Sequence, residues 1–203
     1  MGVDRQATVI FDYGEVISLA PDSTARAAIE RISGVPAEVL WPAYWAERGD
    51  YDRGLAAPEY WRRVAQRCQT TWSTTQLQEI WAADVASWLH VAPTSVALID
   101  RLATRGVELA LLSNAPADIA GALRRSPIVR PFSALFFSCD IGLSKPDPAI
   151  YRHVLSELAS SPSETIFVDD REDNIVTAKE LGIDAHHYTD AAELESFLSD
   201  RLG

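Results

Sequence analysis

The chain has 203 residues, a formal net charge of −11, 47% hydrophobic residues and 23% charged residues. This length predicts one domain, or one domain with a sizeable insertion, whose core is large enough to need no disulfide or structural metal. The acidity argues against nucleic acid or an anionic membrane as the main partner, because both are bound by clusters of lysine and arginine. An anionic substrate would need a local cation to overcome the same acidity.

Cys68 and Cys139 are far apart in the sequence, and we expect both to be small buried apolar residues rather than a disulfide or a catalytic thiol. No apolar run approaches the roughly 20 residues that a membrane-spanning helix needs. The first residues show no basic segment followed by an apolar one, as a secretory signal would. These features predict a soluble cytoplasmic protein.

The first apolar run, residues 8–11, ends at Asp12 and is bounded by Tyr13 and Gly14. Its length and composition predict a buried parallel strand. The stretch that follows, residues 17–90, has helical periodicity and no convincing strand. Helices are expected there at residues 24–32, 36–47, 58–69 and 75–87.

All six tryptophans lie within residues 17–90. An all-helical block inserted after the first strand of an α/β domain predicts a cap. We expect the tryptophans to form the core of this small bundle, with one or two of them lining a substrate pocket.

A charged segment lies ahead of Gly54 in the same block. It consists of Glu47, Arg48, Asp50, Tyr51, Asp52 and Arg53. We expect a solvated turn. The alternative is a substrate-reading loop of the cap, in which Arg48 or Arg53 faces an anionic or hydroxyl-rich group.

The remainder of the chain alternates between strands and helices. Further strands are expected at residues 107–112, 133–138, 165–168 and 184–188, and helices at residues 94–105, 148–158, 172–181 and 191–202. This alternation predicts a doubly wound parallel sheet of the α/β class. The expected domains are a core of residues 1–16 and 91–203 and a helical cap of residues 17–90.

Polar residues follow the predicted strands at the edge where ligands bind in open parallel sheets. They are Asp12, Ser113, Asn114, Lys145, Asp169 and Asp170. Taken singly, each would be an ordinary turn, cap or loop residue. Together they suit phosphoryl transfer, because a carboxylate can attack phosphorus when a divalent cation and a lysine offset the repulsion between anions. Carboxylate oxygens are ligands that suit Mg²⁺.

Four stretches resemble motifs I to IV of the haloacid dehalogenase superfamily. They are VIFDYGEVIS, LLSN, GLSKPDPAIY and FVDDREDNI. Their order and spacing are similar to those of members with a helical cap between motifs I and II, such as the glucose-1-phosphate phosphatase type and the N-terminal phosphatase domains of soluble epoxide hydrolases. The resemblance implies a Rossmann-like core and a Mg²⁺-dependent hydrolase of a small phosphorylated metabolite. The oligomeric state is left open between a monomer and a homodimer.

The resemblance also implies what the catalytic side chains do. Asp12 is expected to be the nucleophile that forms an aspartyl-phosphate. Ser113 is expected to hydrogen-bond a phosphoryl oxygen, with Asn114 beside it. Lys145 is expected to offset the charge of Asp12 and of the phosphate.

The resemblance implies a metal site on the same side of the sheet. Asp12 and Asp170 are expected to bind Mg²⁺ directly. Gly14 is expected to offer its backbone carbonyl, and Asp169 to bind directly or through a water molecule.

Gly14 departs from the family pattern, which usually places a second aspartate there to protonate the leaving group and then activate water. General acid–base catalysis contributes roughly 10²–10⁴ in rate, and its loss matters least for acyl, aryl or anomeric phosphates. Water or another residue is one replacement, since glycine also occurs here in the glucose-1-phosphate phosphatase type. Glu15 is a second, and a catalytically silent binding or regulatory protein is a third possibility.

A 2-haloacid dehalogenase is a further alternative, in which Asp12 attacks carbon and no metal is needed. Members with that activity usually carry an aromatic residue at the position of Gly14. The paired Asp169 and Asp170 also favour a metal, so we rank dehalogenation below phosphate hydrolysis.

Overall fold

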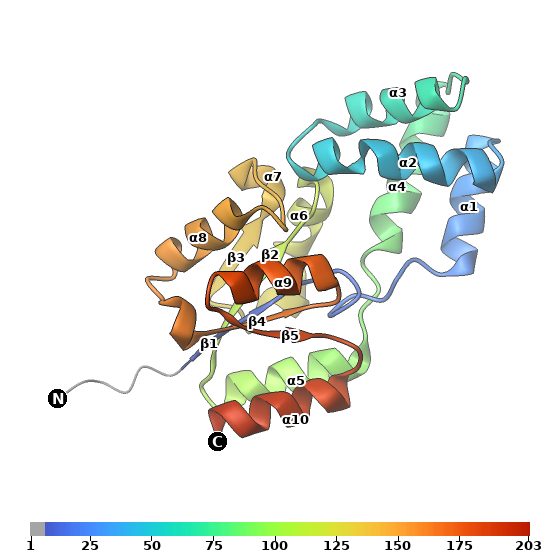
Figure 1. Cartoon of the computed structure of the whole chain (residues 1–203). Coiled ribbons are helices and arrows are strands. Elements are labelled where there is room, and N and C mark those ends of the chain that lie inside the picture. The colour runs from blue at the N-terminus through green and yellow to red at the C-terminus, as the bar shows by residue number, and fades with distance from the viewer. Residues whose placement is uncertain (1–6) are drawn as a thin grey trace.

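The computed structural model describes residues 7–203 and contains a five-stranded sheet in the order β3-β2-β1-β4-β5, in which every pairing is parallel (Figure 1). The strands are β1 (Thr8–Phe11), β2 (Glu108–Ser113), β3 (Ala134–Phe137), β4 (Thr165–Asp169) and β5 (Asp184–His187). Each predicted strand is present, and the prediction of a doubly wound α/β sheet is confirmed. Residues 1–6 of the expected core lie outside the described residues.

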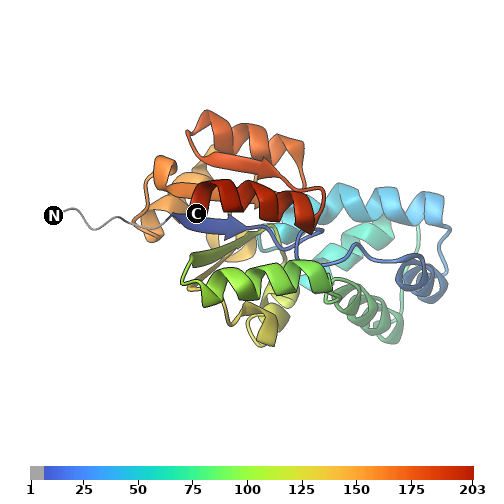
Figure 2. The same ribbon diagram turned by 90° about the horizontal axis from the view of Figure 1, so that it is seen from below.

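Helices cover both faces of the sheet. They are α5 (Pro93–Thr104), α6 (Ala117–Leu123), α7 (Ser138–Ile141), α8 (Pro148–Glu157), α9 (Glu172–Glu180) and α10 (Ala191–Leu202), with 3₁₀ turns at Pro127–Val129 and Pro162–Glu164. Successive strand residues point to opposite faces. Val9 and Phe11 therefore pack with α5, α6 and α10, while Ile10 packs with α8 and α9. Figure 2 shows α5 and α10 side by side on one of these faces.

The remaining helices form a separate block with its own apolar core (Figure 1). They are α1 (Ser23–Ser33), α2 (Ala37–Asp52), α3 (Ala57–Arg67) and α4 (Thr74–Ser87). Tyr44, Tyr60 and Trp61 are almost fully buried at its centre. The four helices expected between residues 17 and 90 are thus present. Of the tryptophans expected in their core, Trp61 and Trp72 are buried there, whereas Trp45 is exposed.

Local sequence signals set the ends of these helices. Asp22 caps α1 by accepting a hydrogen bond from the Ala25 amide at 2.7 Å. α1 ends at Gly34, whose φ of +66° suits a residue without a Cβ. Ser73 and Gln76 form a capping box at the start of α4.

Two connections join the block to the sheet, and they pair with each other. Ser18 and Val91 form an antiparallel bridge, and the Leu19 amide donates to the His90 carbonyl at 2.8 Å. The chain therefore leaves and re-enters the core along neighbouring paths.

The charged segment before Gly54 is helical, so the expectation of a solvated turn is wrong. α2 continues to Asp52 rather than ending at Glu47. Tyr51 is buried and stacks on Tyr60 with ring centroids 4.1 Å apart. Arg48 is also buried, with 7% of its surface exposed. Aromatic packing therefore carries the helix through a stretch whose charge resembles that of a loop.

Two other expectations concern the cysteines and the membrane. Cys68 and Cys139 are unpaired, as expected, but both are only partly buried. Among residues 7–203, no helix is both long and apolar enough to cross a membrane.

Gly54 lies in the turn between α2 and α3 and packs closely against Cys139 of the core. Its φ is +107°, and a Cβ at this position would lie 3.0 Å from the backbone oxygen of Cys139. We expect Gly54→Ala to lower the free energy of unfolding by about 1–3 kcal/mol, because the backbone conformation and the close contact both disfavour a side chain. Urea unfolding followed by circular dichroism measures this change.

Gly49→Ala, within α2, is the matched control. A Cβ there would meet the Arg53 guanidinium at an ordinary distance of 3.6 Å. Alanine also favours a helix interior over glycine. The prediction is contradicted if both variants lose the same free energy of unfolding, or if Gly54→Ala loses none.

Candidate active site

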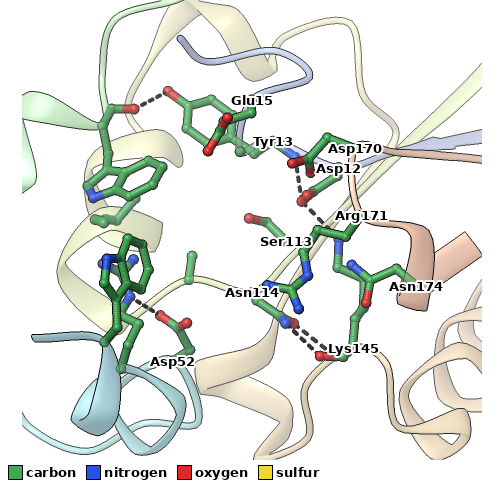
Figure 3. A pocket seen from close by; sticks show the side chains of 16 residues that line it. Asp12, Tyr13, Glu15, Asp52, Ser113, Asn114, Lys145, Asp170, Arg171 and Asn174 are labelled. Atoms are coloured by element: carbon green, nitrogen blue, oxygen red, sulfur yellow. Dashed lines mark hydrogen bonds and ion pairs between the residues drawn. The ribbon is translucent and has the colours of Figure 1, made fainter. Parts of the chain in front are cut away.

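A cavity of about 200 Å³ lies at the carboxyl ends of β1, β2 and β4 (Figure 3). The core lines it with Asp12, Tyr13, Gly14, Glu15, Ser113, Asn114, Ala115, Ile119, Lys145, Asp170, Arg171 and Asn174. The helical block lines it with Trp45, Arg48, Asp52 and Trp88. Most of the predicted strand-end residues therefore share one cavity with residues of the helical block.

The strand register explains why the acidic residues meet. Phe11 of β1 is paired with Leu111 of β2 and with Val168 of β4. Asp12 and Asp169, the next residues along, therefore leave neighbouring strands at the same level. The Asp12 amide also donates to the Val168 carbonyl at 2.8 Å, which fixes the backbone of Asp12 at this edge.

Asp12 and Lys145 form a buried ion pair. The Lys145 ammonium lies 2.9 Å from Asp12 Oδ1 and 2.6 Å from Asp169 Oδ2. It also donates to the Leu112 carbonyl at 2.9 Å. The Tyr13 amide donates to Asp12 Oδ1 at 2.7 Å. These bonds engage Oδ1 of Asp12. Oδ2 takes part in none of them and is therefore the oxygen that can react with a substrate.

Asp169 lies beneath the cavity and is fully buried. Its Oδ2 accepts from Lys145, and its Oδ1 accepts from the Arg171 amide at 2.9 Å and the Asn174 side chain at 2.8 Å. Asp169 therefore positions Lys145 and the loop after β4.

Asn114 holds the loop that carries Lys145. Its Nδ2 donates to the Lys145 carbonyl at 2.8 Å, and its Oδ1 accepts from the Lys145 amide at 2.9 Å. Both polar atoms of its side-chain amide bind this loop, and Asn114 also lines the cavity, so its expected place in the substrate site stays a prediction. Ser113 is different, because its hydroxyl points into the cavity (Figure 3).

The backbone at Gly14 has no left-handed conformation that would require glycine. A Cβ at Gly14 would lie 4.0 Å from Asp12 Oδ2, so a side chain there would stand beside the candidate nucleophile. Glu15 follows on the same loop with a φ of +55°, and it is exposed at the rim of the cavity.

Three carboxylates form a cluster with the composition of a divalent-cation site. Asp12, Asp169 and Asp170 each place an oxygen within 4.8 Å of the others. With Lys145 as the nearby cation, three negative charges face one positive charge. Mg²⁺ would balance the difference, and hard carboxylate oxygens are the ligands that it prefers. The donor set therefore fits the expected metal.

The electrostatic surroundings let Asp12 and Asp170 take up a proton near neutral pH. Burial raises the pKa of Asp12 to about 7, although the Lys145 ammonium acts in the opposite direction. Burial and the adjacent Asp169 raise the pKa of Asp170 to about 6. Burial alone would lower the pKa of Lys145, but Asp12 and Asp169 hold that pKa above its usual range. Protons and a cation therefore compete for the same oxygens.

The cavity wall opposite the sheet is formed by residues of the helical block. The sequence predicts Arg48 there only as an alternative substrate-binding residue, and it indicates no individual role for Asp52. Arg48 places its guanidinium 5.3 Å from the Trp88 ring and 5.9 Å from the Trp45 ring, as in cation–π contacts. Its Nε donates to Asp52 Oδ1 at 2.7 Å. Arg53, the other arginine expected to read substrate, is exposed and pairs with Asp50. The spacing of Arg48 and Asp52 by four residues is the only local sign of their pairing.

A family model described as haloacid dehalogenase-like hydrolase matches residues 7–182. This match confirms the resemblance that the four sequence stretches indicated.

Two curated phosphatases match parts of the chain. A sesquiterpene phosphatase of Aspergillus oryzae is 36% identical over 95 residues, which are 46% of this chain and 48% of that protein. A phosphoglycolate phosphatase of Rhodospirillum rubrum is 30% identical over 104 residues, which are 51% of this chain and 43% of that protein. The matched segment thus spans less than half the length of each relative.

A similar fold has been solved experimentally. A HAD family enzyme of Bacteroides thetaiotaomicron, in complex with magnesium and inorganic phosphate, superposes with a TM-score of 0.74 at 19% identity. The superposition covers 94% of this chain and 99% of that one, so the two share the whole architecture.

Proposed function

We propose that this chain, which belongs to the haloacid dehalogenase-like hydrolase family, hydrolyses a small phosphomonoester through a covalent intermediate on Asp12. The observation that carries the proposal is the convergence of Asp12, Ser113 and Lys145 on one cavity beside a cluster of three carboxylates. The phosphatase names of two relatives, and the magnesium and phosphate bound by a similar enzyme, support it.

In the first half of the reaction, Asp12 Oδ2 attacks the phosphorus atom of the ester. Oδ1 stays bound to the Tyr13 amide and the Lys145 ammonium, which orient the carboxylate. Ser113 donates a hydrogen bond to a phosphoryl oxygen, and Lys145 offsets the charge that gathers at the site. The ester bond breaks and leaves an aspartyl-phosphate. A water molecule then attacks phosphorus and releases phosphate from Asp12.

Asp12, Asp170 and the backbone carbonyl of Gly14 would hold Mg²⁺, with Asp169 reached through water. The bound cation supplies the positive charge that lets an anionic ester approach a carboxylate. Residues 17–90 act as a cap domain on the core formed by residues 1–16 and 91–203, and the cap excludes bulk water from the cavity.

A panel of phosphate esters, assayed with Mg²⁺ and again with EDTA, tests the proposal. We expect turnover above background that disappears when EDTA removes the metal. Because Gly14 provides no carboxyl group, a second candidate function is that the chain binds a phosphate ester without hydrolysing it. Thermal stabilisation by an ester with no release of phosphate would establish that reading instead.

The metal site leads to a prediction about pH. The pKa values of Asp12 and Asp170 lie above those of the unfolded chain, so the folded metal-free protein binds more protons from about pH 4 to about pH 7 and loses stability as pH rises through this range. We expect Mg²⁺ to raise the unfolding temperature more at about pH 8 than at about pH 5, because the cation needs ionised ligands.

Differential scanning calorimetry with Mg²⁺ or EDTA at both pH values measures this effect. Potassium chloride at matched ionic strength is the control, because it screens charges without taking the place of the divalent ion. An equal Mg²⁺ shift at both pH values would argue against Asp12 and Asp170 as ligands.

A further inference from the structure

The helical block presents one carboxyl group, that of Asp52, to the cavity that holds Asp12. Asp52 is the last residue of α2 and lies on the wall that faces Asp12 across the cavity (Figure 3). A carboxyl group on this wall is of interest because Gly14 provides none on the opposite side.

Two contacts tie the end of α2 to the core and fix Asp52 in place. The Ser138 hydroxyl donates to the backbone carbonyl of Asp52, and the Tyr51 hydroxyl donates to Asp118 Oδ2 at 2.7 Å. Both partners belong to the core, one at the start of α7 and one in α6. The carboxyl group of Asp52 is therefore held at the cavity by contacts that need no substrate.

One guanidinium, that of Arg48, is shared by a partly buried carboxyl group, Asp52, which it contacts directly, and a fully buried one, Asp84, which it reaches through Tyr44. Arg48 Nε donates to Asp52 Oδ1 at 2.7 Å, and Arg48 Nη1 donates to the Tyr44 hydroxyl. Tyr44 in turn donates to Asp84 Oδ1 at 2.8 Å. With both carboxyl groups ionised, this cluster would carry one negative charge that Arg48 does not match, so the binding of one proton is favoured.

The groups around Asp52 agree with a carboxyl that exchanges a proton. Burial raises its pKa above the ordinary value, while Arg48 of the same helix and Arg53 just after it act to lower it. Asp84 of α4 and Tyr60 of α3 are the other ionisable groups that interact with it. The side chain is 14% exposed, which leaves it reachable from the cavity.

The geometry of phosphoryl transfer places the leaving oxygen roughly in line with the attacking oxygen, on the far side of phosphorus. When Asp12 attacks, the leaving oxygen therefore points to the opposite wall. Glu15 follows Asp12 on the same loop and is exposed, so it is less well placed. We infer that Asp52 is the general acid that protonates the leaving group, in place of the carboxyl group absent at Gly14. This inference rests on the proposed function.

The protons balance over the whole reaction. Asp12 forms a bond to phosphorus while the bond from phosphorus to the leaving oxygen breaks, and its electron pair stays on that oxygen. Asp52 gives its proton to this oxygen and becomes a carboxylate that Arg48 stabilises. Water then attacks phosphorus, Asp52 takes the proton of that water, and the bond to Asp12 breaks with its electron pair returning to the carboxylate. Alcohol and phosphate leave, and both aspartates are restored.

Asp52→Asn tests the inference through its dependence on the leaving group. An acid matters for benzyl phosphate, whose alkoxide leaves poorly, and matters little for 4-nitrophenyl phosphate, whose phenolate leaves without a proton. We expect kcat/KM to fall by roughly 10²–10³-fold for benzyl phosphate and by less than about tenfold for 4-nitrophenyl phosphate. Asp50→Asn, an exposed aspartate on the same helix, is the matched control and should leave both rates near those of the wild type.

An equal loss on both esters, or no loss on either, would overturn the inference, since a structural role would not discriminate between leaving groups. The wild-type protein provides a second measurement if the variant does not fold. Its rate across a series of substituted phenyl phosphates should depend only weakly on the leaving group, and a steep dependence would also overturn the inference. The proposed function fails separately, when wild-type protein with Mg²⁺ hydrolyses neither ester.

Discussion

Asp12→Asn is expected to lower kcat/KM for phosphate esters by roughly 10⁴-fold or more, because an amide oxygen is too weak a nucleophile to attack phosphorus. Steady-state kinetics with 4-nitrophenyl phosphate and Mg²⁺ measures the loss. The variant should remain folded, since asparagine has the shape of aspartate and Lys145 keeps its contact with Asp169 at 2.6 Å.

Asp100→Asn is the matched control for this loss, because Asp100 is exposed on α5 and its side chain lies away from the cavity. Its kinetics should equal those of the wild type. Full magnesium-dependent turnover in Asp12→Asn would remove the nucleophile from the proposed reaction.

Lys145→Met is expected to reduce both stability and turnover. The Lys145 ammonium lies between Asp12 and Asp169, and all three side chains are buried. Removing the cation leaves two buried carboxylates facing each other without their shared positive charge, and breaking a buried ion pair in this way typically costs about 3–5 kcal/mol. Turnover should fall as well, because the charge that builds up around phosphorus loses its fixed counter-charge. Chemical unfolding in EDTA and steady-state kinetics in Mg²⁺ measure the two effects.

Lys179→Met, at the chain's other lysine, controls for the change of residue type, because Lys179 is exposed on α9. Mg²⁺ should recover part of the stability lost in Lys145→Met, since the cation restores positive charge beside the same carboxylates. A Lys145→Met protein as stable and as active as the control would show that the ion pair serves neither folding nor catalysis.

The sheet could be predicted from sequence because a parallel strand covered on both faces is an uninterrupted apolar run. Thr165–Asp169 is an example, with every residue buried. Proline and glycine also marked helix ends in the sequence, as at Pro93, the first residue of α5, and Gly182, just after α9. The short helices α6 and α7 were missed, because they are too brief to show a periodic pattern.

The end of α2 could not be predicted, because its stabilising partners are distant in sequence. Tyr51 stacks on Tyr60 of α3, and Arg48 lies against Trp88 after α4. The sequence of residues 47–53 shows only a run of charged residues, and such a run usually forms a solvated turn. The same contacts bring Asp52 to the cavity. The cavity residues of the helical block could therefore not be predicted from the sequence either.

The site residues of the core could largely be located from their places after strands. Asp12, Ser113, Lys145 and Asp170 line one cavity because parallel strands end at the same edge. The hydrogen bonds of Asn114 could not be inferred, since they depend on how the loop before Lys145 folds back. Sequence position therefore indicated which residues meet, while the loops decide which of them face the substrate.

The most direct test of this account is the chemical state of Asp12 during turnover. Wild-type protein is mixed with 4-nitrophenyl phosphate and Mg²⁺, quenched in acid within the first turnovers, and digested for mass spectrometry. We predict a phosphoryl group on Asp12 that disappears once the substrate is exhausted. Phosphate release with Asp12 unmodified at every time point, or with the phosphoryl group on another residue, would contradict the account.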